Sequence, residues 1–159
     1  MNKQEIYEYL SQQHIWYEVT EHKAVYNMED LSDVEIPYPQ ADAKNLFIRD
    51  NKKQNYYLIT VRGNQRVDLK AFRKANGTRP LSFASEEDLT EKMGLQAGSV
   101  TPLGVLTCSV KVFVDAYFLE NDALIGVHPN ENTATIWMKT EDLLRIIRAH
   151  GNEVHCVSM

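Results

Sequence analysis

Three short stretches of the sequence combine side chains that can do chemistry with small or rigid neighbours. In the first, Lys44 stands directly before an apolar run that ends in Arg49 and Asp50. A lysine at the start of a strand is either a solvated surface residue or a cation held at the mouth of a site. The stretches 97–104 and 126–135 contain glycines, hydroxyl groups, prolines, a histidine and amide side chains. Such residues allow close approach of a ligand to the backbone, although each stretch taken singly is also typical of an ordinary turn.

Common catalytic and metal-binding signatures are absent from the sequence. It contains no P-loop, no dinucleotide-binding glycine pattern and no nucleophile elbow. No H-x-x-x-H pair occurs among the five histidines, His14, His22, His128, His150 and His155. Cys108 and Cys156 form no C-x-x-C pair, and we expect them to be reduced structural residues. The sequence therefore favours chemistry without a metal and without a cofactor.

Length and composition are typical of one globular domain that covers residues 1–159. Apolar residues make up 43% of the chain and charged residues 25%, with no apolar run of the length that crosses a membrane. The N-terminus lacks the basic and then apolar order of a signal peptide. We expect a soluble, cytosolic protein without membrane association.

The charge of the chain is distributed unevenly. The net charge is -5, but residues 44–79 hold ten cations and two anions, which gives +8 there and -13 elsewhere. A basic segment in an acidic protein can attract phosphate groups while it discourages unspecific binding to nucleic acid such as DNA. Solvated turn and helix surfaces are the alternative interpretation of the same charges.

Hydrophobic periodicity predicts alternating helices and strands. Helices are expected at 2–15, 28–36, 68–77, 85–94 and 141–150, with Asn2, Asp68, Ser85 and Thr140 as N-terminal caps. Strands are expected at 16–22, 45–50, 55–61, 123–127, 133–138 and 153–157, with a long β-rich run at 104–119. Strands outnumber crossover helices, so the predicted fold class is α/β (α+β), with a mixed, largely antiparallel sheet flanked by helices.

Taken together, the three stretches resemble the freestanding aminoacyl-tRNA editing domains of the YbaK/ProX type, which are related to the editing insert of bacterial prolyl-tRNA synthetase. The motifs KNLFIRD, GSVTPLGVL, HPNENTATI and EDLLRII carry the resemblance, which spans nearly the whole chain. It implies a curved mixed sheet and an enzyme that hydrolyses the ester between a wrong amino acid and tRNA. For the subgroup with this N-terminal helix, the implied substrate is alanine on the proline-specific tRNA.

The resemblance also implies roles for individual residues. Lys44 matches the lysine that the family needs for deacylation, and His128 matches the histidine near the ester. Gly98 and Pro102 match the glycine and proline of the substrate-binding loop, which here also contains Ser99 and Thr101. Asn132 aligns with the family's asparagine, whereas Val127 and Asn130 depart from the usual aromatic and apolar residues at positions that would shape the amino-acid pocket.

These matches lead to a hypothesis for the site. Lys44 acts as a cation that anchors the 3′-terminal adenosine or stabilises negative charge, while backbone N–H groups of Gly98 and Ser99 polarise the ester carbonyl. Candidate walls of the amino-acid pocket are Leu46, Ile48, Leu103 and Val127. Cations expected to bind the tRNA acceptor stem are Arg66, Lys70, Arg73 and Lys74.

Partners and alternatives follow from the same resemblance. The expected partner is the acceptor end of an aminoacyl-tRNA, with prolyl-tRNA synthetase as a further candidate. A second hypothesis is a catalytically weak module of the same fold that binds aminoacyl-tRNA or a synthetase. A third is a small-molecule or purely structural domain. Retention of Lys44, the glycine-proline loop and His128 favours the enzyme over both alternatives.

Overall fold

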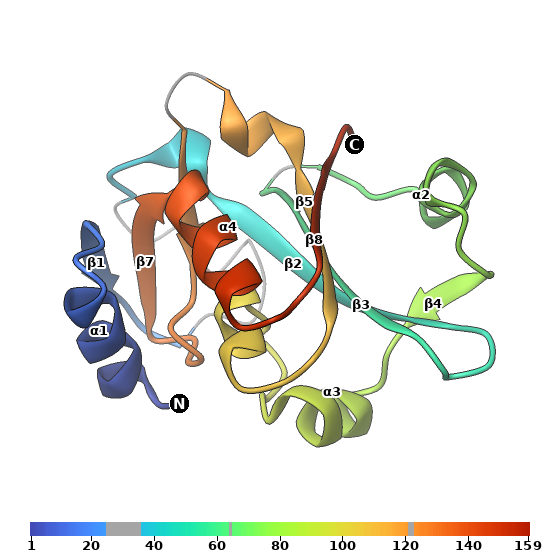
Figure 1. Cartoon of the computed structure of the whole chain (residues 1–159), viewed down its shortest axis with the longest axis horizontal. Coiled ribbons are helices and arrows are strands. Elements are labelled where there is room, and N and C mark those ends of the chain that lie inside the picture. The colour runs from blue at the N-terminus through green and yellow to red at the C-terminus, as the bar shows by residue number, and fades with distance from the viewer. Residues whose placement is uncertain (25–35, 64, 121–122) are drawn as a thin grey trace.

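The computed structural model describes residues 1–24, 36–63, 65–120 and 123–159, and it contains two β-sheets with four α-helices around them (Figure 1). The helices are α1 (Lys3–Gln12), α2 (Leu69–Asn76), α3 (Glu86–Met93) and α4 (Thr140–Ala149). Short 3-10 helices are η2 (Pro39–Ala41), η3 (Pro102–Leu106) and η4 (Ala116–Leu119). The helix predicted at 28–36 falls almost wholly outside the described residues.

The strands form one sheet of five and one of three. The larger sheet has the order β4-β2-β3-β5-β8, from β2 (Ala43–Asp50), β3 (Tyr56–Arg62), β4 (Leu81–Phe83), β5 (Lys111–Asp115) and β8 (Val154–Val157). The smaller sheet has the order β1-β7-β6, from β1 (Tyr17–Glu21), β6 (Leu124–Val127) and β7 (Ala134–Lys139). Pairing is antiparallel except between β3, β5 and β8, so the predicted mixed α/β fold class is confirmed.

Helix starts follow local hydrogen-bonding chemistry in three of the four helices. The side chains of Asn2, Asp68 and Ser85 accept hydrogen bonds from the first-turn N–H groups of α1, α2 and α3, as predicted. The prediction for Thr140 was wrong. Thr140 is the first residue of α4, and its hydroxyl donates to the Ala123 carbonyl at 3.2 Å, so a tertiary contact takes the side chain away from capping.

The β-rich run predicted at 104–119 is not one strand. It is divided into part of η3, the five-residue strand β5 and the short helix η4. Asp115 ends β5 and caps η4 by accepting from the Tyr117 N–H at 3.1 Å. Strand β4 was not predicted, because three residues are too few to show a period. It forms only by pairing with the Ile48–Asp50 end of β2.

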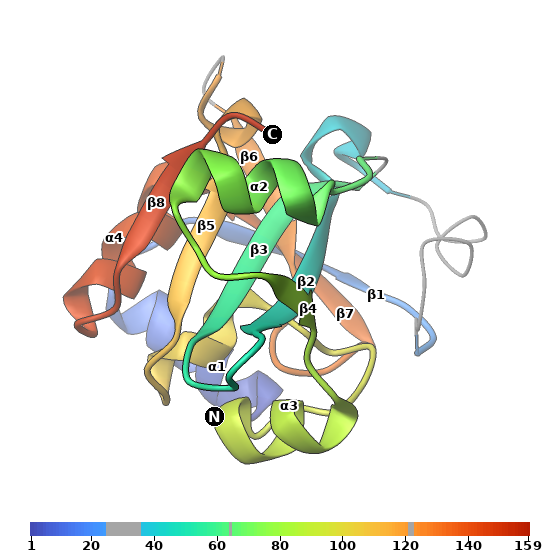
Figure 2. The same cartoon turned by 90° about the vertical axis from the view of Figure 1, so that its right-hand side faces the viewer.

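Two hydrophobic cores lie on opposite faces of the larger sheet. On one face, Phe47 and Leu58 belong to the main core, which α1, α3, α4 and the smaller sheet complete. On the other face, Ile48 and Ile59 pack with Phe72 of α2, and Figure 2 shows α2 lying across this face. Successive strand residues thus serve different cores, as the two-residue period of a strand requires.

A single backbone bridge joins the two sheets. Asp42, just before β2, pairs in parallel with Gly126 of β6, and no further β2–β6 pairing follows among the described residues. Strand β4 covers the same edge of β2 only from Ile48 onward, with one more bond from the Ala84 N–H to the Phe47 carbonyl. Residues 43–46 therefore pair with β3 alone, and the unpaired edge between β2 and β6 beyond the bridge is called the opening below.

Gly126 is required at this junction by the Trp137 ring. A Cβ atom on Gly126 would overlap that ring, whereas on Gly104 it would come within 2.9 Å of the ends of the Leu95 and Met93 side chains. Flexible side-chain ends can move, but a buried indole in a strand cannot. We expect Gly126→Ala to lower the free energy of unfolding by about 1 to 3 kcal/mol in urea denaturation. Gly104→Ala is the matched control, and an equal loss in both variants would contradict this account.

Candidate active site

Lys44 and His128 follow the two residues of the Asp42–Gly126 bridge, Lys44 within β2 and His128 directly after the end of β6. The strands run parallel from Asp42 and Gly126, and Lys44 and His128 each follow their bridge residue by two positions. Alternate residues of a strand point to the same face. Lys44 therefore lies on the face of its cross-strand partner Val61, in the second core, whereas His128 follows the last residue of β6. No hydrogen bond or ion pair joins the two side chains within the described part of the chain.

The imidazole of His128 is held as a neutral base. Its Nδ1 lies 3.0 Å from the Ala134 carbonyl oxygen, so Nδ1 carries the hydrogen and donates it. Nε2 is left with its lone pair. Burial lowers the pKa of His128, and the nearby His22 lowers it further against the opposing effect of the Ala134 bond. A neutral ring with a free acceptor nitrogen suits a general base.

The glycine-proline loop is fixed to the histidine loop through Thr101. The buried Thr101 hydroxyl donates to the His128 carbonyl at 2.7 Å and accepts from the Leu103 N–H at 3.3 Å. Pro102, also buried, begins η3, and Gly98 has a φ of 85°, in the left-handed region that favours glycine. The structure therefore brings Thr101 and Pro102 together with His128.

The loop offers backbone donors, although not the pair that was expected. The Ser99 N–H already donates to the Gln96 carbonyl at 3.0 Å and is used within the loop's own turn. No hydrogen bond within the described residues occupies the N–H groups of Gly98 and Val100. These two amides, unlike that of Ser99, are therefore unbonded within the described residues.

The remaining predicted pocket residues separate into two groups. Leu46 is half-buried and packs against the second core, on the face that also carries Lys44. Asn132 is half-buried in the β6–β7 connection. Ile48, Leu103 and Val127 are at most 1% exposed within the two cores, so they do not line an open pocket, and their prediction as walls is corrected.

Asp42 and His22 lie at the opening and were not predicted as site residues. The pKa of the Asp42 carboxyl is raised to about 6, chiefly by burial, while a bond from the Ala43 N–H and the charge of His22 oppose the rise. His22 Nδ1 donates to the Lys23 carbonyl at 2.8 Å, and Nε2 forms a hydrogen bond with the Thr135 hydroxyl at 3.0 Å. The His22 and His128 rings stand edge to face at 6.3 Å between centroids. Nothing local in the sequence signals this group, because its members come from three separate segments.

The predicted tRNA-binding cations lie on and beside α2, apart from the opening. Arg66, Lys70, Arg73 and Lys74 are all exposed, and none forms an ion pair with a described carboxylate. Figure 2 shows α2 on the same face of the larger sheet that, by the strand register, carries Lys44. The four cations and the opening are thus presented on one side of the molecule.

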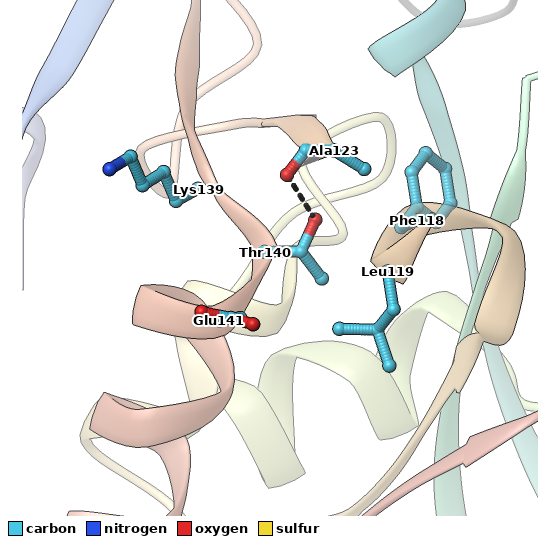
Figure 3. Close-up of a pocket in the computed structure, with 6 residues that line it drawn as sticks. All are labelled: Phe118, Leu119, Ala123, Lys139, Thr140 and Glu141. Atoms are coloured by element: carbon cyan, nitrogen blue, oxygen red, sulfur yellow. Dashed lines mark hydrogen bonds between the residues drawn. The ribbon is translucent and has the colours of Figure 1, made fainter. Parts of the chain in front are cut away.

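A cavity elsewhere contains none of the predicted site residues. It measures about 380 Å³ and is lined by Phe118, Leu119, Ala123, Lys139, Thr140 and Glu141 (Figure 3). Its Thr140 hydroxyl is already bonded to the Ala123 carbonyl. The described residues also contain no cluster of three or more potential metal ligands and no helix long and apolar enough to cross a membrane.

Comparison with known proteins identifies the family. Residues 22–146 match the aminoacyl-tRNA editing domain. The chain is 36% identical to the prolyl-tRNA editing protein ProX of Acetoanaerobium sticklandii, over 99% of this chain and 97% of that protein. It is also 36% identical to prolyl-tRNA synthetase associated domain-containing protein 1 of Mus musculus, over 86% and 83%. The chain belongs to the aminoacyl-tRNA editing domain family, so the predicted resemblance is confirmed.

Solved structures agree on the fold. The crystal structure of a proposed trans-editing enzyme for prolyl-tRNA synthetase superimposes with a TM-score of 0.70 at 21% identity, covering 99% of this chain and 96% of that one. The hypothetical protein APE2540 superimposes with a TM-score of 0.72 at 17% identity, covering 97% and 99%. At these identities the likeness supports the fold alone.

The raised pKa of Asp42 leads to a test of stability against pH. A carboxyl whose pKa rises from 3.8 to about 6 on folding binds its proton more tightly in the folded state. Its ionisation therefore destabilises the fold progressively from about pH 4 to about pH 6, and fully above that. We expect Asp42→Asn to raise the free energy of unfolding by about 1 kcal/mol at neutral pH, allowing for partial exposure, with no gain near pH 4.

The matched control for this test is Asp50→Asn. The Asp50 carboxylate accepts hydrogen bonds from the N–H groups of Lys52 and Gln54 and from the Asn55 amide, so its replacement should destabilise the protein. Urea denaturation of both variants between pH 4 and pH 8 measures the difference. A destabilised Asp42→Asn protein at neutral pH would refute the assignment.

Proposed function

We propose that this protein is a metal-independent hydrolase that removes a wrongly attached amino acid from tRNA, with alanine on proline-specific tRNA as the substrate. The observation that carries the proposal is the opening after the Asp42–Gly126 bridge, flanked by Lys44 and His128, in a chain of the aminoacyl-tRNA editing family. The name of the ProX relative, a prolyl-tRNA editing protein, supports the choice of tRNA. Prolyl-tRNA synthetase as a partner and a cytosolic location belong to the same proposal.

His128 supplies the base in this mechanism. Its Nε2 accepts a hydrogen bond from the attacking water, or from the ribose 2′-hydroxyl that positions it, and takes the proton as the water oxygen bonds to the ester carbonyl carbon. The bond from that carbon to the ribose oxygen then breaks, and the ribose oxygen receives the proton. Free amino acid and tRNA are the products. The lowered pKa of His128 keeps the base unprotonated at neutral pH.

Hydrogen-bond donors and one cation can stabilise the negative charge that develops during the reaction. The free N–H groups of Gly98 and Val100 are suited to the carbonyl oxygen as it becomes an oxyanion. Lys44, across the opening, is suited to the phosphate of the terminal adenosine or to the same oxyanion. A pocket that holds alanine excludes proline because proline is too large to fit. Rejecting a side chain that is smaller than the correct one is harder, because one missing methylene changes the binding free energy by only about 1 to 3 kcal/mol.

Replacement of Lys44 tests whether the protein is an enzyme or a catalytically weak binding module. Lys44 forms no ion pair in the described part of the chain, so Lys44→Ala should leave the unfolding midpoint nearly unchanged. Loss of a group that stabilises developing charge should lower single-turnover deacylation by about 100-fold or more. The substrate panel is tRNA charged with alanine, cysteine, serine or proline. Lys52→Ala, an exposed lysine in the β2–β3 turn, is the control. Near-normal deacylation by Lys44→Ala would exclude the mechanism.

Two exposed arginines test the tRNA surface. Arg73 and Arg148 each lie in the last turn of a helix, on α2 and α4 respectively. If α2 contacts tRNA phosphates, Arg73→Gln should weaken tRNA binding and reduce the slope of log affinity against log salt by about 1. Arg148→Gln should change neither quantity. Filter binding at salt concentrations from about 50 to about 300 mM measures both the affinity and the slope. Equal effects of the two substitutions would count against α2 as the tRNA surface.

A further inference from the structure

Asp42 is a half-buried carboxylate at the opening, and among the described residues the charge of His22 acts on its pKa. None of the ion pairs among the described residues includes it. Its backbone is fully used at the junction: the N–H donates to the Pro39 carbonyl at 3.4 Å, and the carbonyl accepts from the Gly63 N–H at 3.0 Å. The backbone role would be met equally well by many residues. The carboxylate accepts a hydrogen bond from the adjacent Ala43 N–H, and no ion pair among the described residues uses its charge.

We propose that Asp42 binds the α-ammonium group of the aminoacyl moiety and so selects esters of amino acids whose amine is free. The inference rests on the proposed deacylase function and names what the site recognises in its substrate. An α-ammonium is the one cation common to every aminoacyl ester, and a carboxylate is its natural partner. A desolvated carboxylate binds a cation more strongly than a solvated one.

The position of Asp42 fits this role. It precedes Lys44 by two residues, which is roughly 7 Å along the strand, and it pairs with Gly126, two residues before His128. In an aminoacyl ester, the α-nitrogen lies roughly 2.5 Å from the carbonyl carbon, and the ribose and its phosphate extend in the other direction. A negative group at Asp42 and a positive group at Lys44 therefore match the order of charges along the substrate.

No cation among the described residues forms an ion pair with Asp42 that an incoming ammonium would have to displace. His22 is the titratable neighbour with a resolved effect on it, and both His22 ring nitrogens are used by Lys23 and Thr135. Lys44 makes no ion pair with Asp42. The burial that raises the pKa of Asp42 is the cost of keeping a charge there, and an incoming ammonium offsets it.

The experiment compares two substrates that differ only in the amine. The protein is assayed with alanyl-tRNA and with N-acetylalanyl-tRNA, both on proline-specific tRNA, and each deacylation rate is divided by the rate of spontaneous hydrolysis of the same ester. This normalisation removes the intrinsic activation of the ester by its ammonium group. The unmodified protein should prefer alanyl-tRNA by about 10- to 100-fold in kcat/KM, the range expected for one charged hydrogen bond.

Asp42→Asn should abolish that preference. Its kcat/KM for alanyl-tRNA should fall by about 10- to 100-fold, while the value for the N-acetyl substrate changes by less than about threefold. Asp42→Glu should restore part of the preference. Asp142→Asn, a carboxylate on α4 bound to Arg145, is the control and should behave like the unmodified protein.

The outcomes separate this inference from the proposed function. If the unmodified protein hydrolyses neither ester, the deacylase function itself fails. Two results with an active unmodified protein would show that Asp42 does not bind the ammonium group. In the first, Asp42→Asn retains the preference for the free amine; in the second, it loses activity equally on both substrates. Because Asp42→Asn is expected to be more stable than the parent at neutral pH, unfolding does not confuse the result.

Discussion

The parallel backbone bridge between Asp42 and Gly126 is the constraint on which the site depends. It holds β2 and β6 together at one point and lets them separate immediately afterwards. A continuous ladder would have paired the whole edge of β2, whereas the shared main core and this one bridge hold the two sheets together while that edge stays unpaired. One bridge gives a fixed opening lined by residues from both sheets. The Trp137 ring packs closely against Gly126, so a side-chain contact also stabilises the bridge.

Around that opening, burial and hydrogen bonding set the chemical state of each group. The Ala134 carbonyl determines which nitrogen of His128 carries the hydrogen, and burial keeps the ring neutral. Thr101 ties the glycine-proline loop to the histidine loop, so that the donors of one loop are held relative to the base of the other. Ester hydrolysis needs a base and hydrogen-bond donors in fixed positions. The activation free energy is lowered because these groups are already oriented before the substrate binds.

In the folded protein, the basic segment of the sequence forms part of one surface. The exposed cations of α2 and the opening beside Lys44 lie on one side of the molecule, as Figure 2 and the strand register indicate together. An acidic remainder limits unspecific attraction of RNA, because repulsion acts wherever phosphate meets the rest of the surface. Phosphate contacts position a nucleic acid but carry no information about the amino acid. Recognition of the aminoacyl group must therefore come from the opening itself.

By itself, the sequence determined the features that depend on neighbouring residues. Three helix caps, the β2–β3 hairpin and the basic surface of α2 were predicted from short-range patterns, and the quoted motifs led to the family. Lys44, Thr101 and His128 stood out because their local context was unusual. Thr140 and the 104–119 run were misjudged because a contact with Ala123 and the packing of η3 and η4 outweigh local propensity.

Only the tertiary structure decided which residues meet. His22, Asp42 and His128 come from segments that no local pattern connects, and the bridge that assembles them is a contact between residues 42 and 126. The same holds for the protonation of His128, the occupied amide of Ser99 and the burial of Ile48, Leu103 and Val127. Burial and hydrogen bonding are properties of a folded environment, and a sequence states the identity of a side chain without its surroundings.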